Sequence, residues 1–519
     1  MARVYYLISI LVFILSSCAQ VGRLTGGDKD KFAPAPIEKK IAPPNKTLNF
    51  SKNNITIPFD EFIKLKNPTQ NIFIVPPHAK IDAAVKGKDL ILSWDEKLNE
   101  NTTYSIYLNG AVQDISEGND SIIQYVFSTG NHIDTTSYST YIIDAWSNKA
   151  VKNCVLALFD TESGKLINFA ESDAKGFVKL NYVQPAKYKL LAFIDKNRNL
   201  KHDKFEAVGF RQNSIINISE TVIDSSVIRV FTPQPKPQIR SLKFKPPGML
   251  LIGSTHPIEN ESLFINNLKL DKAHYKKITD DSLHVFFNAD SITQLKFVLQ
   301  SENYVDTSRI RITNRQKRSA IQIKNFNKNG IVAPSDSIIL ELNDEIISID
   351  KSKIHLLNSQ DSIEINDVKY DFDLNHLTIS FNRNQHPEVN VELEAGAIIC
   401  TEDTSRIYKG VLTLNAEKKY GIINIDISKY HSALIIEVLN KGKTVRRVPV
   451  SNGMEKMILR ELLPGEYSFR IIIDENNNGR WDTGNIESRT QAEKIAIYAK
   501  PTKVRANWEV DIELIPIDE

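Results

Sequence analysis

Short apolar and β-branched runs, separated by turn residues, recur along almost the whole chain. Residues 55–59 (ITIPF), 89–94 (DLILSW) and 104–108 (YSIYL) are examples near its start. Such runs follow one another at intervals of about 8–12 residues, which is typical of all-β sandwiches, and no stretch keeps a helical period over several turns. Because a chain of 519 residues corresponds to several domains of roughly 100–200 residues each, the sequence predicts tandem β-sandwich modules.

The charge of the chain is nearly balanced, with 65 Lys and Arg against 63 Asp and Glu. A nucleic-acid binder needs a concentrated basic face, so this balance predicts no nucleic-acid partner. The composition is that of an ordinary globular protein, which excludes wholesale disorder and a polytopic membrane protein.

The first 18 residues have the pattern of a signal peptide. Arg3 precedes an apolar run over residues 4–15, which is too short for a membrane-spanning helix of about 20 residues. The run ends in Leu15-Ser16-Ser17-Cys18, which resembles the lipobox of bacterial lipoproteins. The resemblance implies that Cys18 is acylated and becomes the N-terminus, anchored in a membrane by its acyl chains. The alternatives are an ordinary secretory signal with a chance cysteine and a buried apolar helix.

Ala19 follows this cysteine, so the aspartate that retains some lipoproteins in the inner membrane is missing. The resemblance therefore favours the outer membrane of a Gram-negative bacterium, with the periplasmic and the surface-facing orientation both open. Residues 19–44 are rich in Gly and Pro and are predicted to form a flexible tether.

Two kinds of module follow the tether. Residues 59–63 (FDEFI), 98–104 (LNENTTY) and 125–130 (YVFSTG) resemble the bacterial Ig-like domain of SbsA type, predicted over residues 45–130. A weaker echo at residues 338–346 (IILELNDEI) predicts a second such module over residues 319–415.

The second kind of module resembles the Cna B-type, carboxypeptidase-regulatory or transthyretin-like sandwich. Residues 141–145 (YIIDA) and 172–177 (SDAKGF) carry this resemblance, and the module is predicted over residues 133–235. Its late segment recurs at one constant offset near the C-terminus, so residues 420–519 are predicted to form a second copy. Residues 241–318 are strand-patterned but unassigned.

Each copy of the repeat contains a loop rich in Asp and Asn. The oxygen side chains of the first copy have the spacing of an EF-hand calcium loop, with one further position that would offer its backbone carbonyl. The candidate ligands are Asp195, Asn197, Asn199, Lys201 (by its carbonyl), Asp203 and Glu206. The matching residues of the second copy are Asp474, Asn476, Asn478, Arg480 (by its carbonyl) and Asp482.

Surface adhesins with Cna B-type domains hold calcium in similar loops, so the resemblance implies a structural calcium ion. The alternative is an Asx-rich turn without an ion. Each copy departs once from the EF-hand pattern. Leu200 stands where glycine is expected, which strains the turn, and Asn485 replaces the final glutamate unless Glu487 reaches in.

Other motifs in the chain indicate turns or packing rather than catalysis. His256, Glu259 and His386 match a zinc-carboxypeptidase pattern, but those enzymes use an α/β sheet with long helices, so no catalytic zinc is predicted. The acidic pairs Asp60-Glu61 and Asp344-Glu345 are predicted to lie at turns or sandwich edges, because adjacent strand residues point to opposite faces. The remaining predictions are buried free thiols for Cys154 and Cys400 and packing roles for Trp94, Trp146, Trp481 and Trp508.

The sequence therefore predicts a non-enzymatic lipoprotein with a structural, adhesive or scaffolding role. Its expected partners are the membrane, through acylated Cys18, and a protein or glycan ligand. The alternative is a carbohydrate- or peptide-handling accessory protein or enzyme with a site in residues 241–318.

Overall fold

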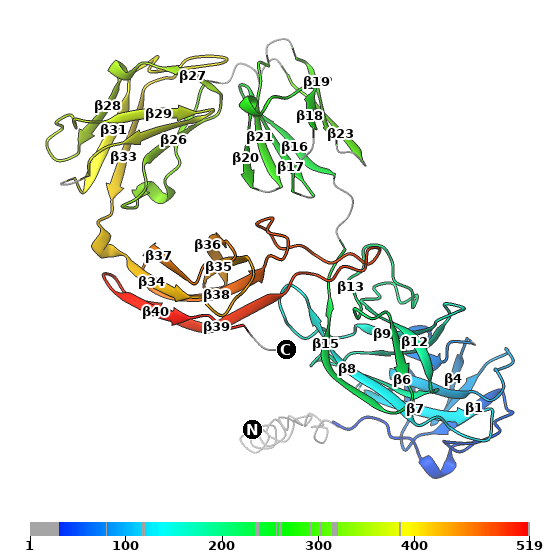
Figure 1. The fold of residues 1–519 in the computed structure, drawn as a ribbon. Helices are drawn as coiled ribbons and strands as arrows, with labels where there is room; N and C mark the ends of the chain where they lie inside the picture. Colours follow the sequence, from blue (N-terminus) through cyan, green and yellow to red (C-terminus); the bar gives the residue numbers. More distant parts are fainter. Residues whose placement is uncertain are drawn as a thin grey trace, which may run out of the picture.

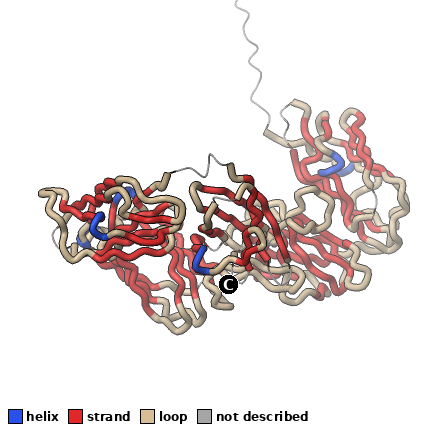
Figure 2. The backbone as a smooth tube through the Cα atoms, turned by 90° about the horizontal axis from the view of Figure 1, so that it is seen from above, coloured by secondary structure: helices blue, strands red, loops and turns tan. Residues whose placement is uncertain are grey.

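The computed structural model describes residues 31–78, 80–116, 118, 120–233, 238–255, 257–258, 262–279, 281–289, 292–300, 304–313, 320–383 and 386–516. Within these residues the fold is nearly all β, as the strand patterns predict, and Figure 2 shows how little helix accompanies the strands. The helices are α2 (Pro68–Asn71) and the 3-10 turns η1 (Glu38–Lys40), η2 (Lys272–His274), η3 (Lys328–Gly330), η4 (Lys351–Lys353) and η5 (Glu417–Lys419). None of the helices in this part of the chain has the length and apolar character needed to cross a membrane. Cys18, His256 and Glu259 lie outside the described residues.

The first module packs two sheets around an aromatic core. Its strands are β1 (Asn54–Pro58), β2 (Ile63–Leu65), β3 (Ile72–Val75), β4 (Asp82–Lys86), β5 (Asp89–Ser93), β6 (Thr103–Asp114) and β7 (Asp120–Ser128). β5 lies between β1 and β4 in one sheet, and β6 pairs with β2, β3 and β7 in the other. Alternate residues such as Ile55 and Ile57 point inward, where they meet the buried Trp94, Tyr104 and Phe127.

The prediction of a flexible tether over residues 19–44 is wrong for the described part of that range, residues 31–44. Ile41 is buried in the core of the first module, and Ala42 and Pro36 form bridges to Thr56 and Phe59. The Gly- and Pro-rich composition suggested a linker, but an apolar side chain that can reach the core is enough to fix the segment against β1. Residues 19–30 lie outside the described residues.

The second and fifth modules share one topology. The strands of the second module are β8 (Thr136–Asp144), β9 (Val155–Asp160), β10 (Leu166–Glu171), β11 (Phe177–Val183), β12 (Ala186–Phe193), β13 (Val208–Gly209), β14 (Ile215–Ile218) and β15 (Val222–Val230). Those of the fifth are β34 (Gly421–Asp426), β35 (Leu434–Asn440), β36 (Lys443–Val450), β37 (Lys456–Leu462), β38 (Gly465–Ile473), β39 (Ile495–Val504) and β40 (Glu509–Glu513). In each, the central strand of a three-stranded sheet (β8 or β34) pairs antiparallel with one neighbour and parallel with the other.

The third and fourth modules are also built from facing sheets. The strands of the third are β16 (Ile239–Lys245), β17 (Met249–Ser254), β18 (Ser262–Ile265), β19 (Leu268–Lys269), β20 (Tyr275–Thr279), β21 (Ser282–Phe286), β22 (Gln294–Gln300) and β23 (Val305–Arg311). Those of the fourth are β24 (Ile323–Asn325), β25 (Ile331–Val332), β26 (Ile338–Leu342), β27 (Ile346–Ile349), β28 (Ile354–Asn358), β29 (Lys369–Asp373), β30 (His376–Ser380), β31 (Glu388–Leu393), β32 (Ile398–Cys400) and β33 (Tyr408–Leu414). Each module has its own hydrophobic core.

The modules do not form a simple string. Figure 1 shows the chain leaving the second module for the third and fourth and then returning, so that the fifth module lies beside the second. Neighbouring modules are joined by polar contacts, among them Lys276 to Asp373 at 2.5 Å and the Ser335 amide to Glu461 at 2.7 Å. The return brings the repeated loop of the fifth module against the second module.

Candidate functional site

The two Asp/Asn loops occupy equivalent places in the second and fifth modules. The first loop follows β12 and the second follows β38. Both are closed at their base by a backbone hydrogen bond, from Ile194 to Ala207 (2.9 Å) and from Ile473 to Lys494 (3.0 Å). Strands, rather than the helices of an EF-hand, therefore set the position of each loop.

Asp195 organises the backbone of the first loop. Its Oδ1 accepts the amide of Asn199 (3.1 Å), and its Oδ2 accepts the amide of Leu200 (2.7 Å). The side-chain amides of Asn197 and Asn199 both donate to Oδ2 of Asp203, at 2.6 and 3.2 Å. The predicted ligand side chains thus face one another, and both oxygens of Asp195 and Oδ2 of Asp203 already have N–H partners.

The second loop repeats this network. Asp474 accepts the amides of Asn478 (2.9 Å) and Gly479 (2.7 Å), and the side chains of Asn476 and Asn478 each donate to Oδ2 of Asp482 at 2.6 Å. Gly479 has φ +78°, and the residue that replaces it in the first loop, Leu200, has φ +57°. The predicted strain at Leu200 is confirmed, because a left-handed conformation suits glycine and costs energy elsewhere.

A glutamate completes each loop, and the structure corrects the sequence prediction for the second. In the first loop, Glu206 accepts the amides of Lys196 (2.7 Å) and Asp203 (3.0 Å) through its two carboxylate oxygens. In the second loop, Glu493 accepts the amides of Glu475 (3.0 Å) and Asp482 (2.9 Å) in the same way.

Glu487 does not take this place. A short hairpin, in which Asn485 and Thr490 pair, is inserted before Glu493 and moves the glutamate further along the chain. Asn485 instead accepts the amides of Glu487 (2.8 Å) and Ser488 (3.1 Å) within that hairpin. A fixed ligand spacing could not find Glu493, because the inserted hairpin lengthens the loop and no local pattern marks this glutamate.

The charges of the second loop are arranged around Asp482. Burial raises the pKa of Glu493 to about 7, and the nearby carboxylates of Asp482 and Asp474 act in the same direction. Burial would also raise the pKa of Asp482, but hydrogen bonds from Arg480 and the two loop asparagines hold that pKa below its usual value. Nε of Arg480 lies 2.9 Å from Oδ1 of Asp482, so Arg480 contributes a guanidinium as well as its backbone.

Each loop also contacts a different module. Arg198 of the first loop donates to Oδ1 of Asn71 (3.0 Å) and to the carbonyl of Gln70 (3.4 Å) in the first module. Leu200 packs into an apolar cluster that contains Phe73 of the first module. The side chain that strains the loop is therefore used at a joint between modules.

The second loop meets the second module through Trp481. Its indole lies edge-on to that of Trp146, with ring centroids 5.0 Å apart, and the guanidinium of Arg470 lies 4.4 Å from the Trp146 ring. These two tryptophans pack against each other, as predicted for packing residues, but they do so across two modules.

The other predicted residues lie apart from the loops. Cys154 and Cys400 are buried free thiols, as predicted, and burial raises the pKa of each to about 12. Asp344 lies in the bend between β26 and β27, as predicted for a turn residue, but it is buried: it is 0% exposed, and burial raises its pKa to about 6. Among the described residues no group of three or more His, Cys, Asp or Glu is placed to hold a metal ion.

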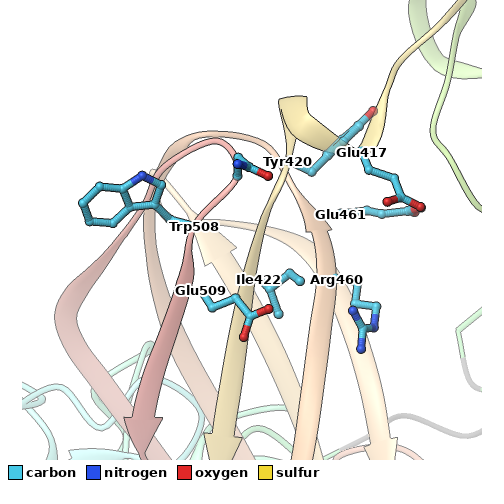
Figure 3. A pocket seen from close by; sticks show the side chains of 8 residues that line it. Glu417, Tyr420, Ile422, Arg460, Glu461, Trp508 and Glu509 are labelled. Atoms are coloured by element: carbon cyan, nitrogen blue, oxygen red, sulfur yellow. The ribbon is translucent and has the colours of Figure 1, made fainter.

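A shallow groove on the fifth module is a further candidate. Two adjoining hollows of about 220 and 510 Å³ lie over β34, β37 and β40 and share Glu509. Figure 3 shows Glu509, Ile422 and Arg460 along the first hollow, whereas the indole of Trp508 points away from them. Trp508 lines the first hollow and is 56% exposed, so it is not the packed residue that the sequence predicted, and the guanidinium of Arg505 lies 4.8 Å from its ring.

Comparison with known proteins defines the class of the first module. The bacterial Ig-like domain model matches residues 33–129, which includes the segment that the sequence assigned to the tether. The described chain is therefore a tandem β-sandwich protein that begins with a bacterial Ig-like domain. No curated protein matches the chain.

Several solved structures of tandem domains are similar at low identity. The Bacillus anthracis TIE protein is 9% identical over 99% of this chain and 79% of its own, with a TM-score of 0.14. The major pilin subunit BcpA of Bacillus cereus is 10% identical over 74% and 99%, with a TM-score of 0.14. The Bacteroides ovatus mixed-linkage glucan utilization locus protein SGBP-B, solved with a mixed-linkage heptasaccharide, is 7% identical over 72% and 94%, with a TM-score of 0.21.

Proposed function

We propose that this protein is a non-enzymatic, acyl-anchored lipoprotein with a structural, adhesive or scaffolding role at the outer membrane of a Gram-negative bacterium. The observation that carries the proposal is the interlocking of the tandem modules, in which the fifth module packs against the second. Joined modules hold their loops and sheet faces at set positions, which suits a binding or scaffolding protein. The topology shared by the second and fifth modules supports assigning both to the Cna B type, and the match at residues 33–129 supports an SbsA-type assignment of the first.

The anchor is tested by metabolic labelling of the full-length chain with palmitate. We expect label on the wild-type protein and on a Ser17→Ala control, which keeps a small residue before the cysteine. A Cys18→Ala variant should carry none and should leave the membrane fraction. An unlabelled wild-type protein would refute the anchor. Protease treatment of intact cells then distinguishes a surface-facing body, which is cleaved, from a periplasmic one.

Calcium is proposed for the first loop on the chemistry of its donor set. Calcium takes oxygen ligands, and Asp195, Asn197, Asn199 and Asp203 supply four side chains that already face one another. The side-chain amides of the two asparagines now point their nitrogen atoms at Asp203. Calcium binding therefore requires these amides to turn their oxygen atoms toward the ion. A bound ion would stabilise one conformation of the long loop that follows β12.

The second loop fits an ion less well. The guanidinium of Arg480 already donates to one oxygen of Asp482, and two asparagine amides donate to the other oxygen of that carboxylate. Glu206 and Glu493 hold backbone amides in both loops, which leaves each glutamate a capping role.

Thermal unfolding in chelator and in about 10 mM calcium tests the ion. With an affinity near 10⁻⁴ M, calcium at about 100 times the dissociation constant stabilises by ~2.7 kcal/mol. We expect the second-module transition to rise, Asp195→Asn to abolish the rise, and the matched Asp474→Asn to retain it. An unchanged wild-type transition would leave an ion-free Asx turn as the correct description.

A second candidate function is ligand handling by the groove of the fifth module. The groove presents carboxylates, an amide, a guanidinium and aliphatic side chains together, the mixture that binds sugars or peptides. Binding to glycan and peptide arrays should fall in Arg460→Ala and persist in Arg447→Ala, which changes an arginine outside the groove. Turnover of any ligand would replace the non-enzymatic proposal.

A further inference from the structure

The contact between the second and fifth modules joins parts of the chain that lie far apart in the sequence. On the fifth module it is made by residues 474–492, which comprise the second loop, the hairpin at residues 485–490 and the two residues after it; we call this segment the clasp. On the second module it is made by Trp146 and by the segment around Phe210 and Phe231. Ala492, which ends the clasp, is buried in the same apolar cluster as Phe210 and Phe231.

Polar contacts fix the position of the clasp on the second module. Gln491 donates to the carbonyl of Phe210 (2.8 Å), and Arg489 donates to the carbonyl of Arg211 (3.1 Å). The guanidinium of Arg489 also lies 4.8 Å from the ring of Phe210. Two neighbouring carbonyls and one ring thus form a docking point for two side chains of the clasp.

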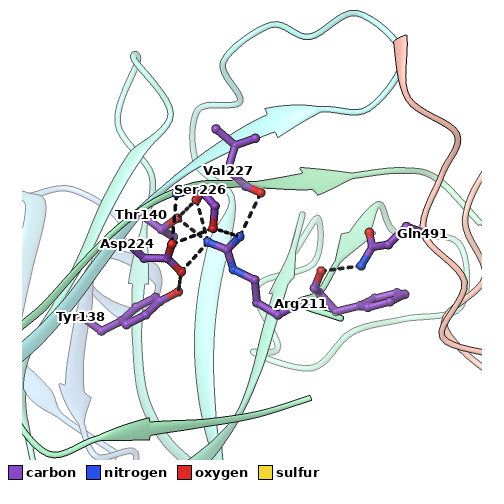
Figure 4. A network of polar contacts seen from close by, with 8 residues as sticks. Tyr138, Thr140, Arg211, Asp224, Ser226, Val227 and Gln491 are labelled. Atoms are coloured by element: carbon purple, nitrogen blue, oxygen red, sulfur yellow. Dashed lines mark hydrogen bonds and ion pairs between the residues drawn. The ribbon is translucent and has the colours of Figure 1, made fainter. Parts of the chain in front are cut away.

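The side chain of Arg211 fixes this docking point to the rest of the second module. Its guanidinium pairs with Asp224 (2.7 Å) and donates to Thr140 (3.0 Å) and to the carbonyl of Ser226 (2.7 Å). Figure 4 shows this network beside the bond from Gln491. The carbonyls that receive the clasp are therefore set by interactions within the second module, so the docking point exists without the clasp.

The fit of the clasp depends on a glycine. A Cβ atom added at Gly484 would lie 2.4 Å from the ring of Phe231, far inside van der Waals contact. Beside it, Thr483 Oγ1 donates to the carbonyl of Thr232 (3.1 Å). Any side chain at Gly484 must push the two modules apart or displace a buried ring.

We propose that the clasp is a separable closure that holds the second to fifth modules in a closed arrangement, and that loosening it swings the fifth module away while each module stays folded. Separation is feasible because the second and fifth modules have distinct cores, which share no residue with each other. The contact that closes them consists of one tryptophan pair, the packing of Ala492 and Ile486 against the apolar cluster that contains Phe210 and Phe231, a few side-chain-to-carbonyl bonds and a glycine fit. The inference rests on these contacts alone and is independent of the anchor and of calcium.

The closure is tested by a disulfide trap in the full-length chain. Thr232→Cys and Thr483→Cys place two thiols at neighbouring positions only when the clasp is docked. The native cysteines of the described chain, Cys154 and Cys400, are buried and compete little. We expect efficient crosslinking under mild oxidation, seen as a mobility shift on a non-reducing gel, and little from a control pair of Thr232→Cys with Ser451→Cys, an exposed residue after β36 outside the clasp.

Clasp variants added to the trap decide the proposal. Trp481→Ala and Gly484→Val should each reduce the crosslinking rate by more than about tenfold, because a central interface tryptophan commonly carries such a share of binding. Trp508→Ala, which truncates an exposed tryptophan of the same module, should leave the rate unchanged. Circular dichroism should show the strand content retained in every variant. Unchanged crosslinking in both clasp variants, or unfolding of the fifth module in both, would overturn the proposal.

Discussion

Asp474→Asn is a direct test of how the second loop is held. Asp474 is 3% exposed, and its two oxygens accept the amides of Asn478 and Gly479. Asparagine keeps the shape but replaces one oxygen by an NH₂ group that faces a backbone N–H. The variant therefore loses one charge-assisted hydrogen bond and buries an opposed donor pair, which together cost about 3 kcal/mol.

A smaller effect opposes this loss. The carboxylate of Asp474 repels that of the buried Glu493. Removing the charge of Asp474 relieves this repulsion and restores stability on the order of 1 kcal/mol. The net expectation is a loss of about 2 kcal/mol for the fifth module. For a module of this size, the melting temperature should fall by roughly 8–16 °C.

The assay is differential scanning calorimetry of the full-length chain in chelator, so that no ion contributes. Because several modules unfold, the transition of the fifth module must be assigned first, by the variant that shifts it most. Asp426→Asn is the control, since the carboxylate of Asp426, at the end of β34, accepts hydrogen bonds from the amide and hydroxyl of the neighbouring Ser428. A shift no larger than that of the control would refute the idea that the Asp474 carboxylate holds the loop.

Three further predictions follow from buried groups. The folded pKa of Asp344, about 6, exceeds its ordinary value of 3.8, so the folded state takes up the proton first. The stability of the fourth module in urea should therefore rise by up to ~3 kcal/mol as pH falls from about 7 to 4, and Asp344→Asn should flatten that dependence. Cys154 and Cys400, with raised pKa values, should resist thiol reagents at pH 8 in the native protein and react on unfolding; rapid native labelling would contradict their burial. Trp94→Ala should destabilise the first module by about 3–5 kcal/mol in chemical denaturation and leave the other transitions in place.

The two loops illustrate what spacing can and cannot predict. Asp195, Asn197, Asn199 and Asp203 are local, so their positions along one loop determine that their side chains meet. The strain at Leu200 was also predictable, because it depends on the backbone of the same turn. The place of Glu493 was not, since an inserted hairpin changes the spacing while the fold restores the contact.

Contacts between modules could not be predicted from the sequence for a related reason. Nothing in the sequence around Trp146 or Trp481 indicates that these residues meet, because their separation is bridged by two whole modules. Asp344 is another case. With Glu345 it forms an acidic pair of the kind usually found on a surface. Packing between the third and fourth modules nevertheless buries Asp344, with Gly248 directly against its carboxylate.

The all-β class, the repeated loop and the buried thiols could be predicted from the residues alone, since alternation, turn residues and Asx spacing act over a few neighbouring residues. Tertiary structure alone decided that the segment near Ile41 joins the first core, that Glu493 completes the second loop, and that the fifth module returns to the second. These outcomes depend on which surfaces bury one another after the modules have formed. That choice depends on the shape and polarity of whole surfaces, which no short stretch of residues contains.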